Sequence, residues 1–191
     1  MIDKKFLAGL KKSYQDSESQ RRQIISASNN LLFLSKKAIF ALQRQELTAG
    51  AKRLTELETA LADMEKRFGA TRLNQEGAFR AAIEEYFEAK SFHLAIQGKI
   101  IAPAKGLDLG HEAYLGGLCD MVGELVRYAT NQAAAGKFAV VSKMKEKADG
   151  LMIELADFDM SGYLRTKYDQ ARGHLRKLEQ MAYEIRLRNK K

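Results

Sequence analysis

The sequence predicts an all-α fold, and three observations support this prediction. Apolar residues recur every three or four positions through most of the chain, which is helical periodicity. No stretch shows the sustained alternation of apolar and polar residues that is typical of a strand. There is also no glycine-rich phosphate loop, no sequence repeat and no linker rich in proline or serine. We expect a bundle of about six to seven helices, arranged as antiparallel hairpins in a single domain of residues 1–191.

The first two predicted helices form one hairpin. The first runs from about Asp16 to Arg44, and its apolar positions are Ile24, Ala27, Leu31, Leu34, Ala38 and Ala41. Residues 48–50 break the pattern, and Gly69 ends the second helix. The apolar positions of that second helix are Leu54, Leu57, Leu61, Met64 and Phe68. Two long antiparallel helices therefore begin the fold.

The next predicted hairpin turns at residues 101–108, a break that contains the only proline, Pro103. The helix before the break spans residues 75–100, and we expect Asn74 to be its N-cap. The helix after the break begins near Asp108, which is expected to cap it. The helix after the break continues to about residue 135.

Gly136 is expected to stop that helix, and two more helices follow it. The first of these has its apolar residues in register at Val141, Met144, Ala148, Leu151 and Leu155. Residues 159–162 interrupt the pattern. The last helix shows a strict alternation of four-residue and three-residue steps at Leu164, Tyr168, Ala171, Leu175, Leu178, Ala182 and Ile185. Such a stripe is typical of a packing seam, either within the chain or between subunits.

Two pairs of acidic residues lie on the helices that flank the central break. Glu85 and Glu88 are three residues apart and Asp120 and Glu124 are four apart, so each pair shares one face of its helix. Glu88 and Asp120 both lie about twelve residues from the break, or ~18 Å at 1.5 Å per residue. Glu85 and Glu124 lie one helical turn further from the break, again at matching distances. An antiparallel hairpin would therefore bring the four carboxylates to one level.

Four neighbouring carboxylates in a protein interior require cations or raised pKa values. Oxygen ligands alone suit a hard divalent ion such as Mg²⁺ or Mn²⁺. The alternative is that these acids form an ordinary solvated helix face. Two facts favour the metal hypothesis: the matched heights, and the apolar residues that surround the acids, since a helix that is apolar on most sides is buried.

Length and composition limit the class of protein. The chain has 191 residues, enough for the core of one domain. No apolar run reaches eighteen residues and the first residues lack the apolar region of a signal peptide, so we expect a soluble, cytoplasmic protein with no membrane partner. Cys119 is the only cysteine, which excludes an internal disulfide framework and a zinc site built from cysteines.

The net charge of +8 is unevenly distributed. Residues 1–67 carry 13 basic and 8 acidic residues and residues 163–191 carry 9 and 3, whereas residues 68–162 carry 10 and 13. An acidic centre between basic ends is suited to an acidic polymer that the ends hold over a metal site. The basic residues that we expect to contact this polymer are Arg21, Arg22, Lys36, Lys37, Arg44 and Arg127.

Five segments carry a resemblance to a known family. They are Ser35–Arg44, Glu85–Phe92, Tyr114–Gly117, Asp120–Arg127 and Leu164–Asp169. Together they resemble the translin superfamily, and within it the branch of translin-associated factor X (TRAX), over nearly the whole chain from about Glu18. The Gly-Glu-Leu-x-Arg sequence with its upstream aspartate, within Asp120–Arg127, is the most specific part of this resemblance.

The resemblance implies a translin-like helical subunit that assembles into a closed oligomer, commonly an octamer. In the complex called component 3 promoter of RISC, the TRAX subunit is a Mg²⁺-dependent endoribonuclease, whereas translin binds nucleic acid and lacks the acids. The TRAX acids correspond to Glu85, Glu88, Asp120 and Glu124. We expect a prokaryotic, archaeal-type homomer, in which one chain supplies both the acids and the basic surface.

We therefore predict a Mg²⁺-dependent endoribonuclease that acts on single-stranded or partly structured RNA. Glu85, Glu88 and Asp120 would bind the metal, and Glu124 would bind it or orient water. Arg127 lies near the same face and could contact a phosphate, although an ion pair with Glu124 is an equally good interpretation. One alternative is a non-catalytic, translin-like protein that binds single-stranded RNA or DNA.

A second alternative is an all-α nucleoside triphosphate pyrophosphatase. Enzymes of that class use Glu-x-x-Glu on one helix and Glu-x-x-Asp on the next. Here the second pair reads Asp-x-x-x-Glu, with the wrong order and spacing, so this alternative ranks below the other two.

Overall fold

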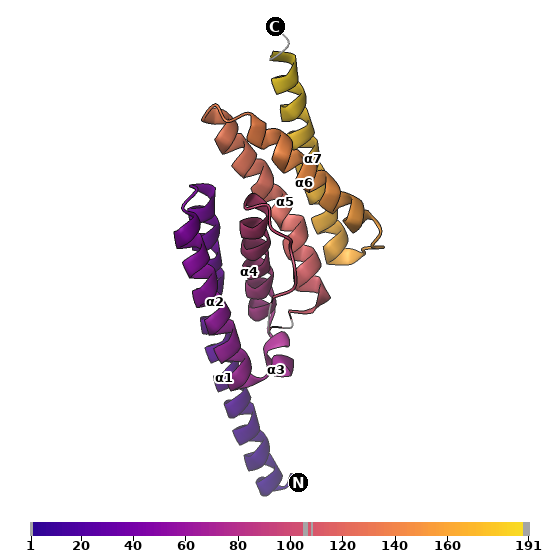
Figure 1. Ribbon diagram of the computed structural model, residues 1–191. Helices are drawn as coiled ribbons and strands as arrows, with labels where there is room; N and C mark the ends of the chain where they lie inside the picture. Colours follow the sequence, from indigo (N-terminus) through magenta and orange to yellow (C-terminus); the bar gives the residue numbers. More distant parts are fainter. Residues whose placement is uncertain (1, 105–106, 108, 189–191) are drawn as a thin grey trace.

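In the computed structural model, the described residues are 2–104, 107 and 109–188. Across them the chain forms seven helices and no strand, which confirms the all-α prediction (Figure 1). The helices are α1 (Lys4–Gln43), α2 (Leu47–Phe68), α3 (Ala70–Asn74), α4 (Gly77–Ile96), α5 (Gly110–Ala134), α6 (Ala139–Ala156) and α7 (Gly162–Arg188). Within this part of the chain, none of the helices has the length and apolarity needed to cross a membrane.

Helix α1 begins twelve residues earlier than the sequence predicted, so the predicted start at Asp16 is wrong. The carboxylate of Asp3 caps this earlier start by accepting a hydrogen bond of 2.7 Å from the backbone N–H of Lys5. Residues 4–17, here called the N-terminal arm, are all exposed and project beyond the bundle (Figure 1). The arm packs on no core of the subunit, although Phe6, Leu10 and Tyr14 follow one another at four-residue spacing, which is the helical signal that could have identified the earlier start.

The prediction for the start of α4 is also wrong. Asn74 is the last residue of α3, a five-residue helix that the sequence analysis missed, and Glu76 is the N-cap of α4. The carboxylate of Glu76 makes no capping hydrogen bond, because it forms an ion pair of 2.7 Å with Arg72. The far end of α4 lies at Ile96 rather than near residue 100. The predicted N-cap Asp108 lies outside the described residues, and α5 begins at Gly110.

Two predicted glycine stops are confirmed. Gly69 and Gly136 both have a φ of +78°, a left-handed conformation that glycine adopts without steric cost. Gly69 follows the last residue of α2, and Gly136 lies two residues beyond the end of α5. The two breaks therefore come from backbone conformation as well as from the loss of apolar periodicity.

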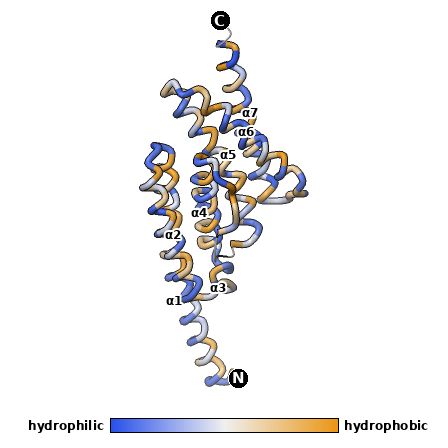
Figure 2. The backbone as a smooth tube through the Cα atoms, viewed as in Figure 1, coloured by the Kyte–Doolittle hydropathy of each residue, from blue (hydrophilic) through white to orange (hydrophobic). Residues whose placement is uncertain are grey.

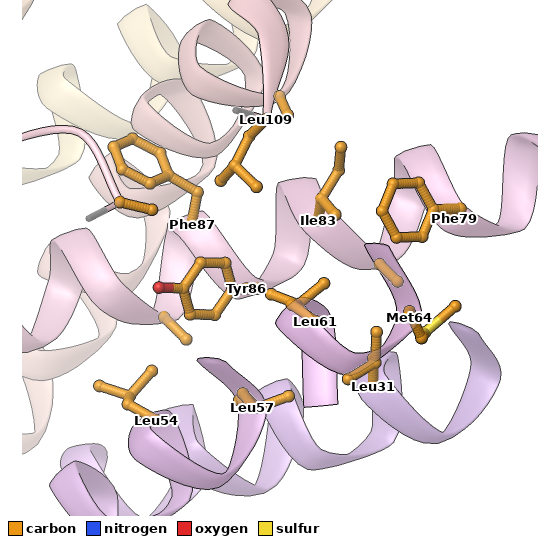
Figure 3. Packing of buried hydrophobic residues seen from close by; sticks show 14 of the residues in the cluster. Leu31, Leu54, Leu57, Leu61, Met64, Phe79, Ile83, Tyr86, Phe87 and Leu109 are labelled. Carbon is orange, nitrogen blue, oxygen red and sulfur yellow. The ribbon is translucent and has the colours of Figure 1, made fainter. Parts of the chain in front are cut away.

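Helix α4 lies at the centre of the fold, between the α1–α2 hairpin and α5 (Figures 1 and 2). It carries buried residues on most of its faces, among them Tyr86, Phe87 and Phe92, which contribute to two apolar clusters. In the first cluster, Tyr86 and Ile83 face leucines of α1 and α2 (Figure 3). The second cluster joins α4 and α5 to α6 and α7. Because α4 is buried on most of its faces, a polar side chain on this helix also lies in the interior.

Helices α4 and α5 approach closely at Gly117. A Cβ at this position would lie 3.0 Å from both the carbonyl oxygen of Glu84 and the backbone nitrogen of Glu88. Real Cβ contacts with backbone atoms are seldom that short, so only glycine fits here without a shift of the helices. The acid-bearing faces of the two helices are held together by this close backbone contact.

The apolar stripe of α7 forms a packing seam within the chain, as the sequence predicted. Ala171, Leu178 and Ala182 are buried against the cluster that α5 and α6 share. Leu164, Tyr168, Leu175 and Ile185 are partly buried in the same cluster. The stripe is thus used to hold α7 on α5 and α6, and assembly between subunits stays a prediction.

Candidate active site

The α4–α5 hairpin brings the four predicted acids within electrostatic range of one another. Glu85 and Glu88 come from α4, and Asp120 and Glu124 come from α5. The charges of Glu85, Asp120 and Glu124 all act on the carboxyl group of Glu88. With the helix ends at Ile96 and Gly110 the distances from the break are unequal, but the predicted antiparallel hairpin still places the four side chains where they influence one another.

Glu88 is the most buried of the four acids, with 8% of its surface exposed. Within the described part of the chain, its carboxyl group has neither a hydrogen bond nor an ion pair. Burial, and then the negative charges of Glu85, Asp120 and Glu124, raise the pKa of Glu88 to about 9. In the metal-free protein this carboxyl group is therefore protonated at neutral pH. Buried polar groups usually have a partner, so a buried carboxyl group without one is a candidate ligand for a cation.

Lys167 of α7 places a positive charge beside the acids, and the sequence analysis missed it. Its ammonium group donates a hydrogen bond to the carboxylate of Asp120 and lies 2.9 Å from Oε1 of Glu84. The hydroxyl of Tyr163 also donates to Oε1 of Glu84, at 2.6 Å. Lys167 belongs to the segment of α7 that carries the family resemblance, and this was the signal that could have identified it.

Lys167 keeps its charge despite being half-buried. Burial alone would lower the pKa of Lys167, but hydrogen bonds with Asp120, Glu84 and Tyr163 outweigh that effect and raise it. The pKa of Asp120 is raised by burial, and the nearby ammonium group opposes this rise. Asp120 and Lys167 thus form an ion pair inside the site.

Glu124 is held by Gln43, a second residue that the sequence analysis missed. The amide Nε2 of Gln43 lies 2.6 Å from Oε2 of Glu124 and 3.0 Å from its backbone oxygen. The Oε1 of Gln43 accepts a hydrogen bond of 3.2 Å from Asn131. Arg127 lies 3.7 Å from Glu124, so the ion pair that was one of its two interpretations is present. Gln43 belongs to the segment Ser35–Arg44 that carries the family resemblance, and this was the signal that could have identified it.

The four acids fit a hard cation by donor chemistry, because all their donors are carboxylate oxygens. Their positions do not yet form a binding cage. In the described chain, no group of three or more histidine, cysteine, aspartate or glutamate side chains is spaced to hold a metal ion. Lys167 binds Asp120 and Gln43 binds Glu124, so both of these carboxylates already have partners. Cation binding would require these side chains to change partners.

The six residues predicted to contact RNA are all exposed. Arg21, Arg22, Lys36 and Lys37 lie on α1, Arg44 is its C-cap and Arg127 lies on α5. Three of these cations form ion pairs: Arg127 with Glu124, as described above, and Arg21 and Arg44 with other partners. Arg21 lies 3.5 Å from Glu76, and Arg44 lies 2.8 Å from Glu46.

Residues 19–189 match the Translin family. Comparison with curated protein sequences gives no match.

Three solved structures share the fold. The crystal structure of apo-NeC3PO matches with a TM-score of 0.82 and 24% identity, over 96% of this chain and 97% of that one. The crystal structure of AfC3PO matches with a TM-score of 0.83 and 22% identity, over 97% and 99%. The complex of AfC3PO with duplex RNA matches with a TM-score of 0.82 and 23% identity, over 95% and 96%. The family match covers most of the chain and agrees with the helical fold, so this protein belongs to the Translin family.

Proposed function

We propose that the protein is a Mg²⁺-dependent endoribonuclease of the TRAX-like branch, acting on single-stranded or partly structured RNA. The observation that carries the proposal is the buried Glu88, which has no partner among the described residues and is surrounded by three other acids. The Translin family match and the similarity in fold to AfC3PO, solved with duplex RNA, support the RNA part of the proposal.

Glu85, Glu88, Asp120 and Glu124 would hold Mg²⁺ or Mn²⁺, and the bound ion would supply an activated water and a Lewis acid for the phosphate oxygens. Glu88 has to release its proton before it can act as a ligand, since its pKa is about 9 without a cation. Lys167 neutralises Asp120 in the metal-free state and would have to release that carboxylate. The chain thus supplies its own positive charge where the metal is proposed to bind.

The test is cleavage of a labelled single-stranded RNA with Mg²⁺ and with EDTA, together with RNA binding in EDTA. Wild type should cleave only with Mg²⁺. Glu88→Gln and Asp120→Asn should lose cleavage yet bind RNA as wild type does, because neither change removes a basic residue. Glu56→Gln, an exposed change on α2, is the matched control and should cleave normally. Wild-type protein that binds RNA but never cleaves it with Mg²⁺ or Mn²⁺ would exclude the nuclease.

A non-catalytic protein that binds single-stranded RNA or DNA is the second candidate function. It is favoured by the ion pair of Asp120 with Lys167 and by the hydrogen bond of Glu124 with Gln43, which satisfy two acids without a metal. Membership of the Translin family argues against the pyrophosphatase alternative.

We also propose a homo-octamer of a prokaryotic, archaeal-type chain. Its mass should be close to eight times 21.5 kDa. Light scattering at micromolar concentration measures this directly, and a monomer would exclude the closed assembly.

A further inference from the structure

The solvent-facing side of α1 carries two large aromatic rings among its basic residues. Phe33 and Phe40 are 53% and 46% exposed, although the same part of the helix buries Leu31, Ile39 and Leu42. The two rings are seven residues apart, so they share one face and lie ~10 Å apart along the helix axis. Lys36 and Lys37 lie between them on that face. We name these four residues the α1 strip.

Each ring of the α1 strip has a cation against it. The ammonium group of Lys37 lies 4.2 Å from the centroid of the Phe33 ring. The guanidinium group of Arg127, on α5, lies 5.0 Å from the centroid of the Phe40 ring. Such cation–π pairs keep positive charge at the rings and leave ring surface open to solvent. Exposed aromatic rings with cations beside them are the combination with which proteins bind single-stranded nucleic acid.

The α1 strip leads directly to the acids. Arg127 touches Phe40 on one side and lies 3.7 Å from Glu124 on the other. Burial raises the pKa of Glu85, and the nearby ammonium group of Lys36 is the strongest influence that opposes this rise. The strip therefore adjoins two acids of the cluster, Glu124 through Arg127 and Glu85 through Lys36, so that the bases and the phosphates of a strand would each meet suitable groups.

We infer that Phe33 and Phe40 form a stacking platform that selects single-stranded RNA and leads the strand to the acid cluster. This inference rests on the proposed function. The ~10 Å between the rings corresponds to about three nucleotide steps of 3.4 Å. A duplex hides the faces of its bases, so it can use the cations of the strip but not the rings. A protein partner fits less well, because the rings are surrounded by lysine and arginine side chains and adjoin carboxylates.

The test compares binding of a single-stranded oligouridylate and of an RNA duplex of equal length, both in EDTA so that cleavage cannot interfere. The double variant Phe33→Ala/Phe40→Ala should lose about tenfold or more in affinity for the single strand, since stacking on one ring is worth about tenfold. Its affinity for the duplex should stay within about twofold of wild type. Phe138→Ala/Phe158→Ala is the matched control, because these rings are 45% and 53% exposed at the two ends of α6, and it should change neither affinity.

The salt dependence separates stacking from charge. The slope of log affinity against log salt should be unchanged in the double phenylalanine variant, whereas Lys36→Gln/Lys37→Gln should flatten it for both RNAs. Equal losses on duplex and single strand, or no loss at all, would overturn the inference. A change of oligomeric mass in light scattering would overturn it too, because the rings would then be a subunit contact. Absence of cleavage with Mg²⁺ would exclude the proposed nuclease, but it would not change the binding results that test the stacking platform.

Discussion

Gln43 donates a hydrogen bond of 2.6 Å from its side-chain amide to the carboxylate of Glu124, 81 residues further along the chain. This contact joins the last residue of α1 to the middle of α5. Asn131 orients Gln43, because its side-chain amide donates a hydrogen bond to Oε1 of Gln43. The amide thus fixes one of the four acids without neutralising its charge.

Gln43→Ala should lower the free energy of unfolding by about 1–3 kcal/mol, because it leaves polar groups of Glu124 and Asn131 without their buried partner. Urea unfolding measures the change. Gln20→Ala lies on an exposed turn of the same helix and should stay within about 0.5 kcal/mol of wild type. Equal stability of the two variants would mean that water replaces Gln43 at no cost.

Glu88→Gln should become more stable than wild type as the pH rises. The pKa of Glu88 is raised from 4.5 to about 9 by burial and by the neighbouring acids. The native state therefore binds this proton more tightly than the unfolded state, and the resulting stability is complete below about pH 4.5 and lost as the pH approaches 9. Glutamine keeps the neutral form at every pH.

Urea unfolding in EDTA at about pH 6, 7.5 and 9 should therefore show a growing advantage of Glu88→Gln, with a limit on the order of 1.4 kcal/mol per pH unit. Glu56→Gln, at an exposed position, should show no such trend. Parallel pH curves for wild type and Glu88→Gln would contradict the raised pKa.

Gly117→Ala should destabilise the protein by about 1–3 kcal/mol, since its methyl group would press on backbone atoms of α4 that cannot move independently. Gly150→Ala is the matched control on α6, where a Cβ would meet no atom within 4 Å. That change should raise stability by about 0.5–1 kcal/mol, through the lower flexibility of the unfolded chain. Thermal unfolding should show stability changes of opposite sign in the two variants. Unchanged stability in Gly117→Ala would show that α4 and α5 can separate freely.

Lys167→Met should lower the thermal midpoint in EDTA, because Asp120 and Glu84 lose the cation they share. With Mg²⁺ the midpoint of this variant should rise by more than that of wild type, since the metal no longer competes with an ammonium group. Lys177→Met, exposed on the same helix, should behave as wild type does in both conditions. Absence of any Mg²⁺ response in all three proteins would argue for purely structural acids.

The sequence predicted those features that local spacing determines. The ends of α2 and α5 follow from Gly69 and Gly136, which end helices by their backbone conformation. The predicted break at residues 48–50 is wrong, because these residues lie inside α2 and the chain turns at residues 44–46. That the four acids lie near one another followed from the predicted antiparallel hairpin. In contrast, α3 has five residues, too few for a period to show, and the N-terminal arm has no buried face.

The partners of the acids could not be predicted in the same way. Lys167 is 47 residues from Asp120, and Gln43 is 81 residues from Glu124. Their positions depend on how α7 and α1 pack against α5, which no spacing within one helix specifies. The exposure of Phe33 and Phe40 is a different case. Both lie on the face of α1 opposite its apolar stripe, so the periodicity of the sequence already indicated a solvent-facing position for them.

The N-terminal arm has a consequence for the way the subunit moves in solution. With 40 residues, α1 is ~60 Å long. This length exceeds the diameter of a compact chain of this size, whose radius of gyration is about 16 Å. The subunit is thus longer along α1 than a sphere of equal mass would be (Figure 1). A free monomer should rotate faster about the α1 axis than about any perpendicular axis, whereas a subunit in the proposed octamer would tumble with the assembly. Amide groups of α1, whose N–H bonds lie along that axis, should therefore relax at a rate different from those of helices inclined to it.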